Sequence, residues 1–507
     1  MSRPAVRSLG GLAVALARQW WPQLAALAVT SGVVATAMTG ALGVGDGIRG
    51  GLGRLAVERL GRIDAVVLAD GFVRRDLAAE LAAGGGEPRL ACTPAVVMPV
   101  TVAAGARRGA VAAATLLACD DPAALGFVPP APPLEADAVF VNGVLAAAAG
   151  IAAGDEIVLR LPVRASVPAD SPLGRRTNET VGRRLRVKEV LPERGLGRFS
   201  LRPSLAPEPL VVVALAEAQA MLRAGDVANA VFVVGDGSAA VAATAARRLR
   251  PRLSDLGTTL EPLPDRGLRL TSAKLVVPPE IDRAAERVLA AAGGRPTLVL
   301  LATSLAAERG RAAVPYSTVL GIGSTTLPAG PLVDAAGATL PLPAADEILI
   351  NRWLADDLAA QGTPVAVGDA LVMTTFEPET IHGRVEERTD TFRIAGVAEM
   401  RGGAVDPTLV PDVEGVTDEA SIADWDPPFP FDAERVRTVP PHDEDDRYWK
   451  EHRATPKAFI ALEAARRIGG SRFGRTTAWH VPDAAGSPAG LFPGRRCFLN
   501  GWGPPCL

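Results

Sequence analysis

The stretch that decides the organisation of this chain is Leu24–Val44, LAALAVTSGVVATAMTGALGV. No charged residue occurs between Arg18 and Asp46. As a helix, these 21 positions would measure roughly 31 Å, which matches the ~30 Å hydrocarbon layer of a bilayer. The sequence therefore predicts one membrane-spanning helix near the start of the chain.

The charges that flank this stretch predict its orientation. Arg3, Arg7 and Arg18 precede it with no acidic residue among them, whereas the residues directly after it carry both signs. The positive-inside rule then places residues 1–22 in the cytoplasm and everything after Asp46 outside. The predicted transmembrane helix and its extension occupy residues 23–60.

The alternative interpretation is a cleaved signal peptide. Its apolar core would be Leu24–Val34, and Ala35-Thr36-Ala37 would be the cleavage site. We favour the anchor because the core starts late and the uncharged run continues for eight residues past Ala37. A helical apolar pattern also continues beyond the membrane.

Small residues recur every four positions along the predicted membrane helix, as in Ala28, Gly32, Thr36 and Gly40. In lipid such a face lets a second helix approach closely. An alanine-rich sequence also produces this spacing by chance, so both interpretations stay open here.

Composition excludes some classes of partner and leaves others open. The chain has 507 residues and a net charge of −3, so no global charge favours nucleic acid as a partner. Its four cysteines could pair outside the cytoplasm in three ways or remain free thiols, and the sequence does not choose. They are Cys92, Cys119, Cys497 and Cys506.

An internal repeat carries more weight than any single motif. Val139-Phe140-Val141-Asn142 is matched by Ile348-Leu349-Ile350-Asn351, and each is followed by Leu-Ala in a helical stretch. Each copy then reaches Gly-Asp, at Gly154-Asp155 and Gly368-Asp369, which opens an apolar strand. A return strand, a proline-led strand that enters a helix, and a closing strand complete each copy.

The Gly-Asp step predicts equivalent turns in the two copies. Glycine adopts a positive φ without steric cost, and an aspartate carboxylate accepts hydrogen bonds from nearby backbone. Asn142 and Gly154 are 12 positions apart, whereas Asn351 and Gly368 are 17 apart. We expect the five extra residues in the loop Gln361–Val367.

Short strands that alternate with helices predict an α+β fold, namely a single transmembrane helix followed by a mixed α/β extracytoplasmic body with two related lobes. Within the first lobe, Phe72–Ala83 is expected to be a helix. The expected segments are a first lobe at 61–265 (repeat copy 138–235), a connecting α/β segment at 266–345, a second lobe at 346–482 and an irregular Gly/Pro-rich tail at 483–507.

The order of anchor, V-x-V-N, L-A, G-D, return strand and P-x-x-x-x-A-L resembles the periplasmic core of MacB-type, FtsX-like permeases of ABC transporters. The resemblance covers residues 9–482, and residues 45–50 also resemble the segment after the first membrane helix in that family. It implies a place in the bacterial inner membrane, a body that transmits conformational change, and a cytoplasmic P-loop ATPase subunit as partner.

In that family three further membrane helices follow, whereas residues 486–507 contain no apolar span. The resemblance therefore implies a truncated or frameshifted copy, or membrane helices supplied by another permease chain or copy. The expected function is a membrane-anchored, non-ATPase permease-type subunit. The alternative is a single-pass or secreted periplasmic interaction module without a transport role.

Catalytic motifs are not found in the sequence. No P-loop G-x-x-x-x-G-K-[ST] and no nucleophile elbow G-x-S-x-G occurs. Gly45-x-Gly47-x-x-Gly50 matches the dinucleotide fingerprint, but a membrane-length run precedes it instead of a strand. We therefore expect no enzyme, no catalytic residue, no cofactor and no metal.

Two further segments invite a functional interpretation. His442 leads into Asp443-Glu444-Asp445-Asp446, which we interpret as a solvated acidic loop because it lacks the spacing of a calcium loop. Asp424–Phe431 concentrates aromatic residues, and we favour a plug of a long insertion over a partner-contact patch.

Overall fold

The computed structural model describes residues 8–104, 111–162, 180–202, 204, 206–223, 225–377, 386–427 and 429–482. It is a mixed α+β structure, with an N-terminal apolar helix followed by a β-rich body of two similar barrel-like lobes. The α+β class and the two related lobes expected from the sequence are therefore present.

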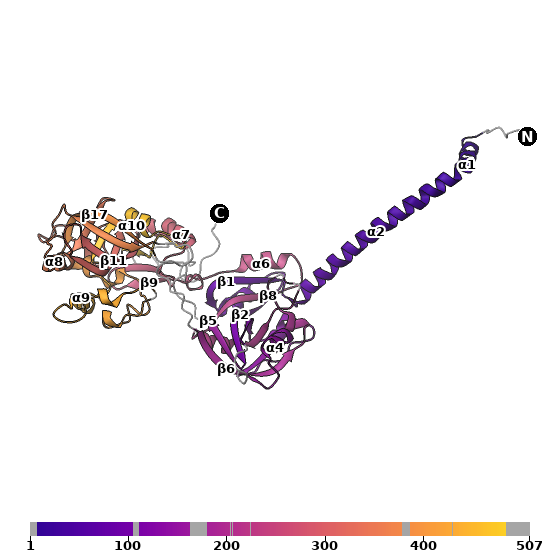
Figure 1. Ribbon diagram of the computed structural model, residues 1–507, viewed down its shortest axis with the longest axis horizontal. Helices are drawn as coiled ribbons and strands as arrows, with labels where there is room; N and C mark the ends of the chain where they lie inside the picture. Colours follow the sequence, from indigo (N-terminus) through magenta and orange to yellow (C-terminus); the bar gives the residue numbers. More distant parts are fainter. Residues whose placement is uncertain are drawn as a thin grey trace, which may run out of the picture. The chain divides into compact units, whose positions relative to one another are not determined.

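Two helices begin the described chain (Figure 1). α1, Leu9–Gln19, starts after Ser8, whose hydroxyl accepts a hydrogen bond from the Gly11 backbone N–H at 3.1 Å. α2, Trp21–Glu58, is 38 residues long and continues well past the apolar stretch, as its pattern predicts. The separate helix α1 was not expected from the sequence.

The first lobe is built on an eight-stranded sheet in the order β1-β8-β2-β3-β7-β4-β6-β5. β2 also pairs with β5, so the strands from β2 to β5 close into a barrel. The strands are β1 (Ala65–Arg74), β2 (Ala91–Ala104), β3 (Val111–Cys119), β4 (Ala138–Asn142), β5 (Glu156–Pro162), β6 (Thr180–Leu191), β7 (Leu210–Ala214) and β8 (Val227–Val234).

Among the described residues of this lobe, the α-helices are α3 (Asp76–Ala83), α4 (Gly143–Ala149), α5 (Leu215–Leu222) and α6 (Ala240–Arg248). α3 and α6 contribute Leu81 and Val241 to an apolar cluster on β1 and β8. The prediction of a helix from Phe72 is wrong at its start, because β1 continues to Arg74 after an irregularity between Leu68 and Val73. Pairing with β8 overrides the local helical pattern there.

The second lobe repeats this architecture in a nine-stranded sheet ordered β12-β18-β15-β17-β16-β11-β19-β10-β9, and β12 also pairs with β11 to close a barrel. The strands are β9 (Thr258–Leu263), β10 (Gly267–Ser272), β11 (Arg295–Ala307), β12 (Ala313–Ile322), β15 (Glu347–Asn351), β16 (Ala370–Phe376), β17 (Glu387–Ala398), β18 (Ala458–Ala461) and β19 (Ala478–Val481). A two-stranded sheet, β13 (Thr326–Leu327) with β14 (Gly330–Pro331), lies apart from it.

The helices of the second lobe are α7 (Pro279–Leu289), α8 (Arg352–Ala360), α9 (Glu444–His452) and α10 (Leu462–Gly469). The barrel core is formed by buried aliphatic side chains of the strands together with Leu354 and Leu358 of α8 and Ile468 of α10. α7 covers one face of β10 and β19 through Ile281 and Leu289.

The two lobes share strand directions as well as strand order. β3 pairs parallel with β7, and β12 pairs parallel with β18. β4 pairs parallel with β6, and β15 with β17, and in both pairs the register shifts after the second paired residue, Val139 or Ile348. β10-α7-β11-β12 corresponds in order and pairing to β1-α3-β2-β3. The repeat thus includes residues 267–322, and these supply three strands to the second sheet.

The equivalent turns predicted from Gly-Asp are present. Gly154 and Gly368 have φ of 93° and 100°, and their N–H groups donate to Val187 and Ile394 carbonyls at 2.7 and 2.8 Å. The prediction for the five extra residues is only partly right. Asn142 is eight positions from the left-handed Gly150, and Asn351 is eleven from the left-handed Gly362. Three extra residues therefore lengthen helix α8 and its end, and two lie in the following loop.

Candidate functional site: the surface of helix α2

The most prominent functional feature is the apolar surface of α2. One helix among the described residues, Trp21–Gly53, is long and apolar enough to cross a membrane. Its most apolar part is not buried in the protein. Large side chains such as Leu27, Val33 and Leu42 are each more than 60% exposed. Covering this much apolar surface is favourable by about 25 cal/mol per Å², so the helix surface favours contact with lipid or with another apolar helix.

Two threonine hydroxyls of this helix are bonded within the helix. Thr30 and Thr36 donate their hydroxyl hydrogens to the carbonyls of Ala26 and Gly32, both at 2.8 Å. Hydrocarbon offers no hydrogen-bond partner, so a helix that enters it must satisfy such groups along its own backbone. The hydroxyls of Thr30 and Thr36 are therefore compatible with a hydrocarbon environment.

The small-residue face of α2 is open for close approach. A Cβ added at Gly32 or Gly40 would have no neighbouring heavy atom within 4 Å. Gly43, Gly45 and Gly47 are equally unobstructed. Glycine destabilises an isolated helix in water by about 1 kcal/mol relative to alanine. A face of this kind is typical of helices that pack against another helix in lipid.

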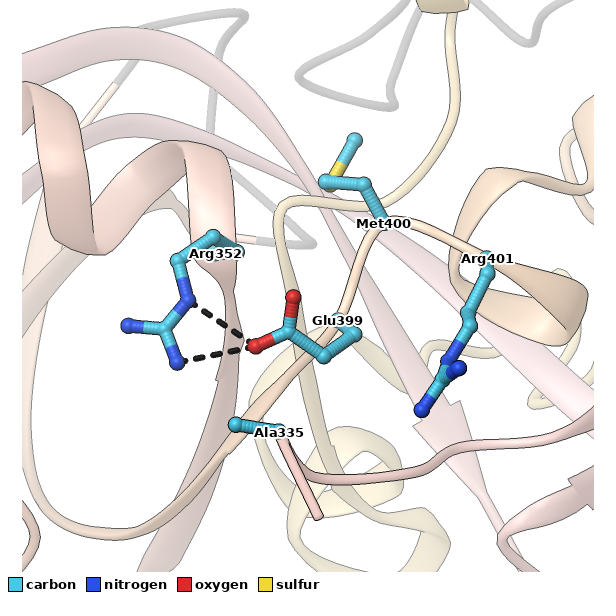
Figure 2. A pocket seen from close by; sticks show the side chains of 5 residues that line it. All are labelled: Ala335, Arg352, Glu399, Met400 and Arg401. Carbon is cyan, nitrogen blue, oxygen red and sulfur yellow. Dashed lines mark hydrogen bonds and ion pairs between the residues drawn. The ribbon is translucent and has the colours of Figure 1, made fainter. Parts of the chain in front are cut away.

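The second lobe has a pocket of about 310 Å³ beside the start of α8. Figure 2 shows its lining residues, Ala335, Arg352, Glu399, Met400 and Arg401, with Glu399 between the two arginines. Arg352 donates from Nε and Nη2 to one oxygen of Glu399 at 3.1 and 2.9 Å. These two hydrogen bonds occupy the Nε and Nη2 donors of Arg352. The five lining residues do not include a nucleophilic side chain next to a general base. The pocket does not point to catalysis.

The acidic run after His442 is not a solvated loop, which corrects the sequence interpretation. Glu444, Asp445 and Asp446 form the first turn of α9, where negative charge is favourable. Asp445 and Asp446 are buried. Among the described residues, no group of three or more His, Cys, Asp or Glu side chains is placed to hold a metal ion.

A buried ion network explains why these carboxylates are inside. The Arg437 guanidinium donates to Asp357 of α8 at 2.6 and 2.7 Å and to Asp445 of α9 at 2.7 and 2.9 Å. Burial acts to raise the pKa of Asp357, but the hydrogen bonds from Arg437 and Gln361 and the charges of Arg437 and Lys457 together lower this pKa. Burial lowers the pKa of Lys457, whose Nζ lies 3.8 Å from Asp445. The network fastens the insertion between β17 and β18 to the barrel.

The aromatic segment 424–431 is a plug, as favoured from the sequence. Phe429 is buried, and Trp425 and Phe431 are partly buried, in one apolar cluster with Tyr316 of β12 and Trp449 of α9. The Trp425 and Trp449 rings pack edge to face, with 4.8 Å between the ring centroids. The cluster therefore stabilises the insertion against the barrel instead of presenting rings to a partner.

The other residues that could carry chemistry, His480 and the two described cysteines, do not form one site with each other. His480 of β19 is buried, and neither of its ring nitrogens has a hydrogen-bond partner. Burial, and then the nearby positive charge of Arg269, lower the pKa of His480 to about 4. Cys92 and Cys119 are free thiols, and burial raises their pKa values to about 11 and 12. His382 and the other two cysteines, Cys497 and Cys506, lie outside the described residues.

No protein-family model matches the sequence, and the search of curated proteins finds no match either.

Proposed function

We propose that this chain is a membrane-anchored, non-ATPase, permease-type subunit of a MacB/FtsX-like ABC transporter. α2 anchors it in the bacterial inner membrane with the N-terminus in the cytoplasm, and the two-lobed body lies outside and transmits conformational change. The observation that carries this proposal is the exposed apolar surface of α2, on which the Thr30 and Thr36 hydroxyls bond to the helix's own backbone.

Two features support the transmission role. α2 is one continuous helix that runs 14 residues past Val44 to Glu58, and β1 begins seven residues later at Ala65. In this proposal a displacement of the helix reaches β1 through the six residues that connect them. The lobes themselves are closed barrels with dense apolar cores, and such bodies move as units.

The proposal requires partners. A single helix encloses no passage, so in this proposal further membrane helices come from other chains. No P-loop motif occurs in the sequence, so a cytoplasmic P-loop ATPase supplies the energy for the transporter complex. The face containing Gly32, Thr36 and Gly40 is where we place the contact with a partner helix, because its glycines are unobstructed.

The experiment that tests the partner contact compares two substitutions on opposite sides of α2. Gly32→Leu fills the small-residue face, whereas Ala41→Leu lies nine positions on, about half a turn around the helix. Co-purification of an ATPase and membrane partners from detergent extracts should fall with Gly32→Leu and persist with Ala41→Leu. Equal recovery with both variants would contradict this contact, and ATP hydrolysis by the isolated chain would contradict the proposed role.

A second candidate is a secreted or single-pass periplasmic interaction module. A helix near the N-terminus that is apolar and unburied is also what a signal sequence provides. A soluble product that begins near Met38 would favour this function.

A further inference from the structure

The pocket beside the start of α8 contains charged groups that the protein uses only in part (Figure 2). Arg352 donates from Nε and Nη2 to one oxygen of Glu399, Oε1. Among the described residues, nothing donates a hydrogen bond to the other oxygen, Oε2. In the same described part of the chain, the Arg401 guanidinium makes no ion pair and a single hydrogen bond, from Nη2 to the Asp334 carbonyl at 3.4 Å. The pocket therefore offers an unbonded carboxylate oxygen together with a guanidinium whose donors are largely free.

Backbone hydrogen bonds fix the segments that line this pocket. The Glu399 N–H donates to the Val333 carbonyl at 2.9 Å, and the Arg401 N–H donates to the Glu399 carbonyl at 2.7 Å. Ala335 lies in a turn that is closed by a hydrogen bond to the Asp334 carboxylate at 2.9 Å. A ligand would therefore enter a site that is already formed, which reduces the ordering cost of binding.

The repeat shows that the Arg352–Glu399 ion pair is not needed to build a lobe. Gly143 and Arg352 are equivalent, because each follows the capping asparagine of its copy. Pro192 and Glu399 are equivalent, because each follows the residue of the return strand that is paired with that asparagine. The first lobe thus closes the same barrel with a glycine and a proline at these two places. The ion pair is an addition to the second lobe, which favours a role other than holding the fold.

We propose that this pocket binds a small zwitterion, namely a free α-amino acid. The ammonium group of the ligand donates to Oε2 of Glu399, and its carboxylate accepts from the Arg401 guanidinium, whose planar donor fork matches a carboxylate. Arg352 acts as a positioning residue, because its two hydrogen bonds hold Glu399 in place.

The lining selects for a ligand that carries both charges. A simple anion would meet the like charge of Glu399, and a simple cation would meet two arginines, so either one loses part of its attraction to repulsion. Met400 and Ala335 give apolar contact to the rest of the ligand. The volume of about 310 Å³ lies at the lower end of the range for ligand pockets, roughly 300–1,000 Å³, and therefore suits a small molecule.

Saturation-transfer NMR titration of the purified full chain in detergent, near neutral pH, tests the proposal. The probes are glycine, L-alanine and L-leucine, and propionate and ethylamine each carry only one of the two charged groups. At least one amino acid should bind with a dissociation constant of about 1 mM or below, and about tenfold more tightly than propionate or ethylamine. Absence of binding by all three amino acids, or equally tight binding of propionate, would overturn the proposal.

Two substitutions in the pocket assign the two charged contacts. Arg401→Gln removes the partner of the carboxylate and should weaken binding of the amino acid about tenfold. Glu399→Gln should weaken the amino acid by a similar factor but strengthen propionate, because it removes the charge that repels a simple anion. The matched control is Arg283→Gln on α7, which removes an exposed arginine outside the pocket and should leave both dissociation constants unchanged. Amino-acid binding that survives both pocket substitutions, or that falls equally with Arg283→Gln, would overturn the assignment.

Discussion

Asp155 and Asp369, 214 positions apart in the chain, make the same hydrogen bond in the two lobes. Each carboxylate accepts from the backbone N–H three residues earlier, Ala152 or Ala366, at 2.8 Å in both cases. The carbonyls of Asp155 and Asp369 also accept from Val187 and Ile394 at 2.8 Å. The turn is therefore a repeated structural device that sets the register between a strand and its return strand.

The first prediction concerns this device. Asp155→Ala and Asp369→Ala each remove one exposed hydrogen bond of the same geometry, so each should lower the free energy of unfolding of its lobe by about 0.5–1.5 kcal/mol. Urea denaturation of the two variants measures this. Effects that differ by more than about 2 kcal/mol would contradict the equivalence of the turns.

The second prediction concerns the buried asparagine of each copy. Asn351 accepts from the Leu354 N–H at 2.8 Å and donates to the Tyr448 hydroxyl at 3.1 Å and the Pro456 carbonyl at 3.3 Å. Asn351→Ala leaves these groups unpaired in the core and should cost about 2–4 kcal/mol of unfolding free energy. Asn351→Asp retains the acceptor for Leu354 and is the matched comparison.

Asn142→Ala should be similarly costly in the first lobe. Its side chain accepts from Leu145 and Leu210 N–H groups and donates to the Gly197 and Glu208 carbonyls, at 2.7 to 3.1 Å. Thermal unfolding followed by circular dichroism would register the loss. A transition unchanged from the parent chain would show that the asparagine is dispensable.

The third prediction concerns the ion network of the insertion. Arg437→Ala leaves two buried carboxylates without their shared partner and should destabilise the second lobe by about 3–5 kcal/mol. Arg447 of the same region is half exposed and pairs weakly with Asp443 at 3.9 Å. Arg447→Ala should therefore change stability by less than about 1 kcal/mol. Comparable losses for both variants would contradict the structural role of Arg437.

The fourth prediction concerns pH. His480 has a folded-state pKa of about 4 against an ordinary value of 6.5, because burial disfavours the charged ring. Its neutral form is therefore favoured by folding, so its contribution is intact above pH 6.5 and is lost as the pH falls from 6.5 to 4. The loss should approach about 3 kcal/mol of unfolding free energy.

The control for this pH dependence is His480→Gln, which cannot titrate. Arg269 and Asp406 are the charged neighbours that act on the ring, and both stay in place in this variant. The variant should lose most of the slope of unfolding free energy between pH 6.5 and 4.5. A slope that survives the substitution would assign the acid sensitivity to other groups.

Local chemistry made the repeat readable from the sequence. Asn142 and Asn351 cap helices by bonding three residues ahead, and Gly-Asp closes a turn within four residues, so both signals lie within short segments. The extent of the repeat was missed for the opposite reason. Strands β1 to β3 and β10 to β12 are recognised as equivalent by their pairing partners, which lie far away in the sequence.

The closure of the two barrels and the burial of individual side chains could not be predicted from the sequence either. The β2–β5 and β11–β12 pairings depend on register between distant strands. The acidic run at Glu444–Asp446 resembled a surface loop because nothing in the sequence identifies its bonding partners. In the fold, Arg437 donates to Asp445 and Ser421 donates to Asp446. The apolar helix was predicted correctly because its length and lack of charge are properties of one continuous segment.

The most direct test of the account is alkaline fractionation of bacterial cells that express the full chain with a reporter, active only in the periplasm, fused after Val481. We predict a full-length fusion in the washed membrane pellet with an active reporter, because α2 anchors the chain and the body lies outside. A soluble product that begins near Met38, or an inactive reporter on a membrane-bound chain, would contradict the account.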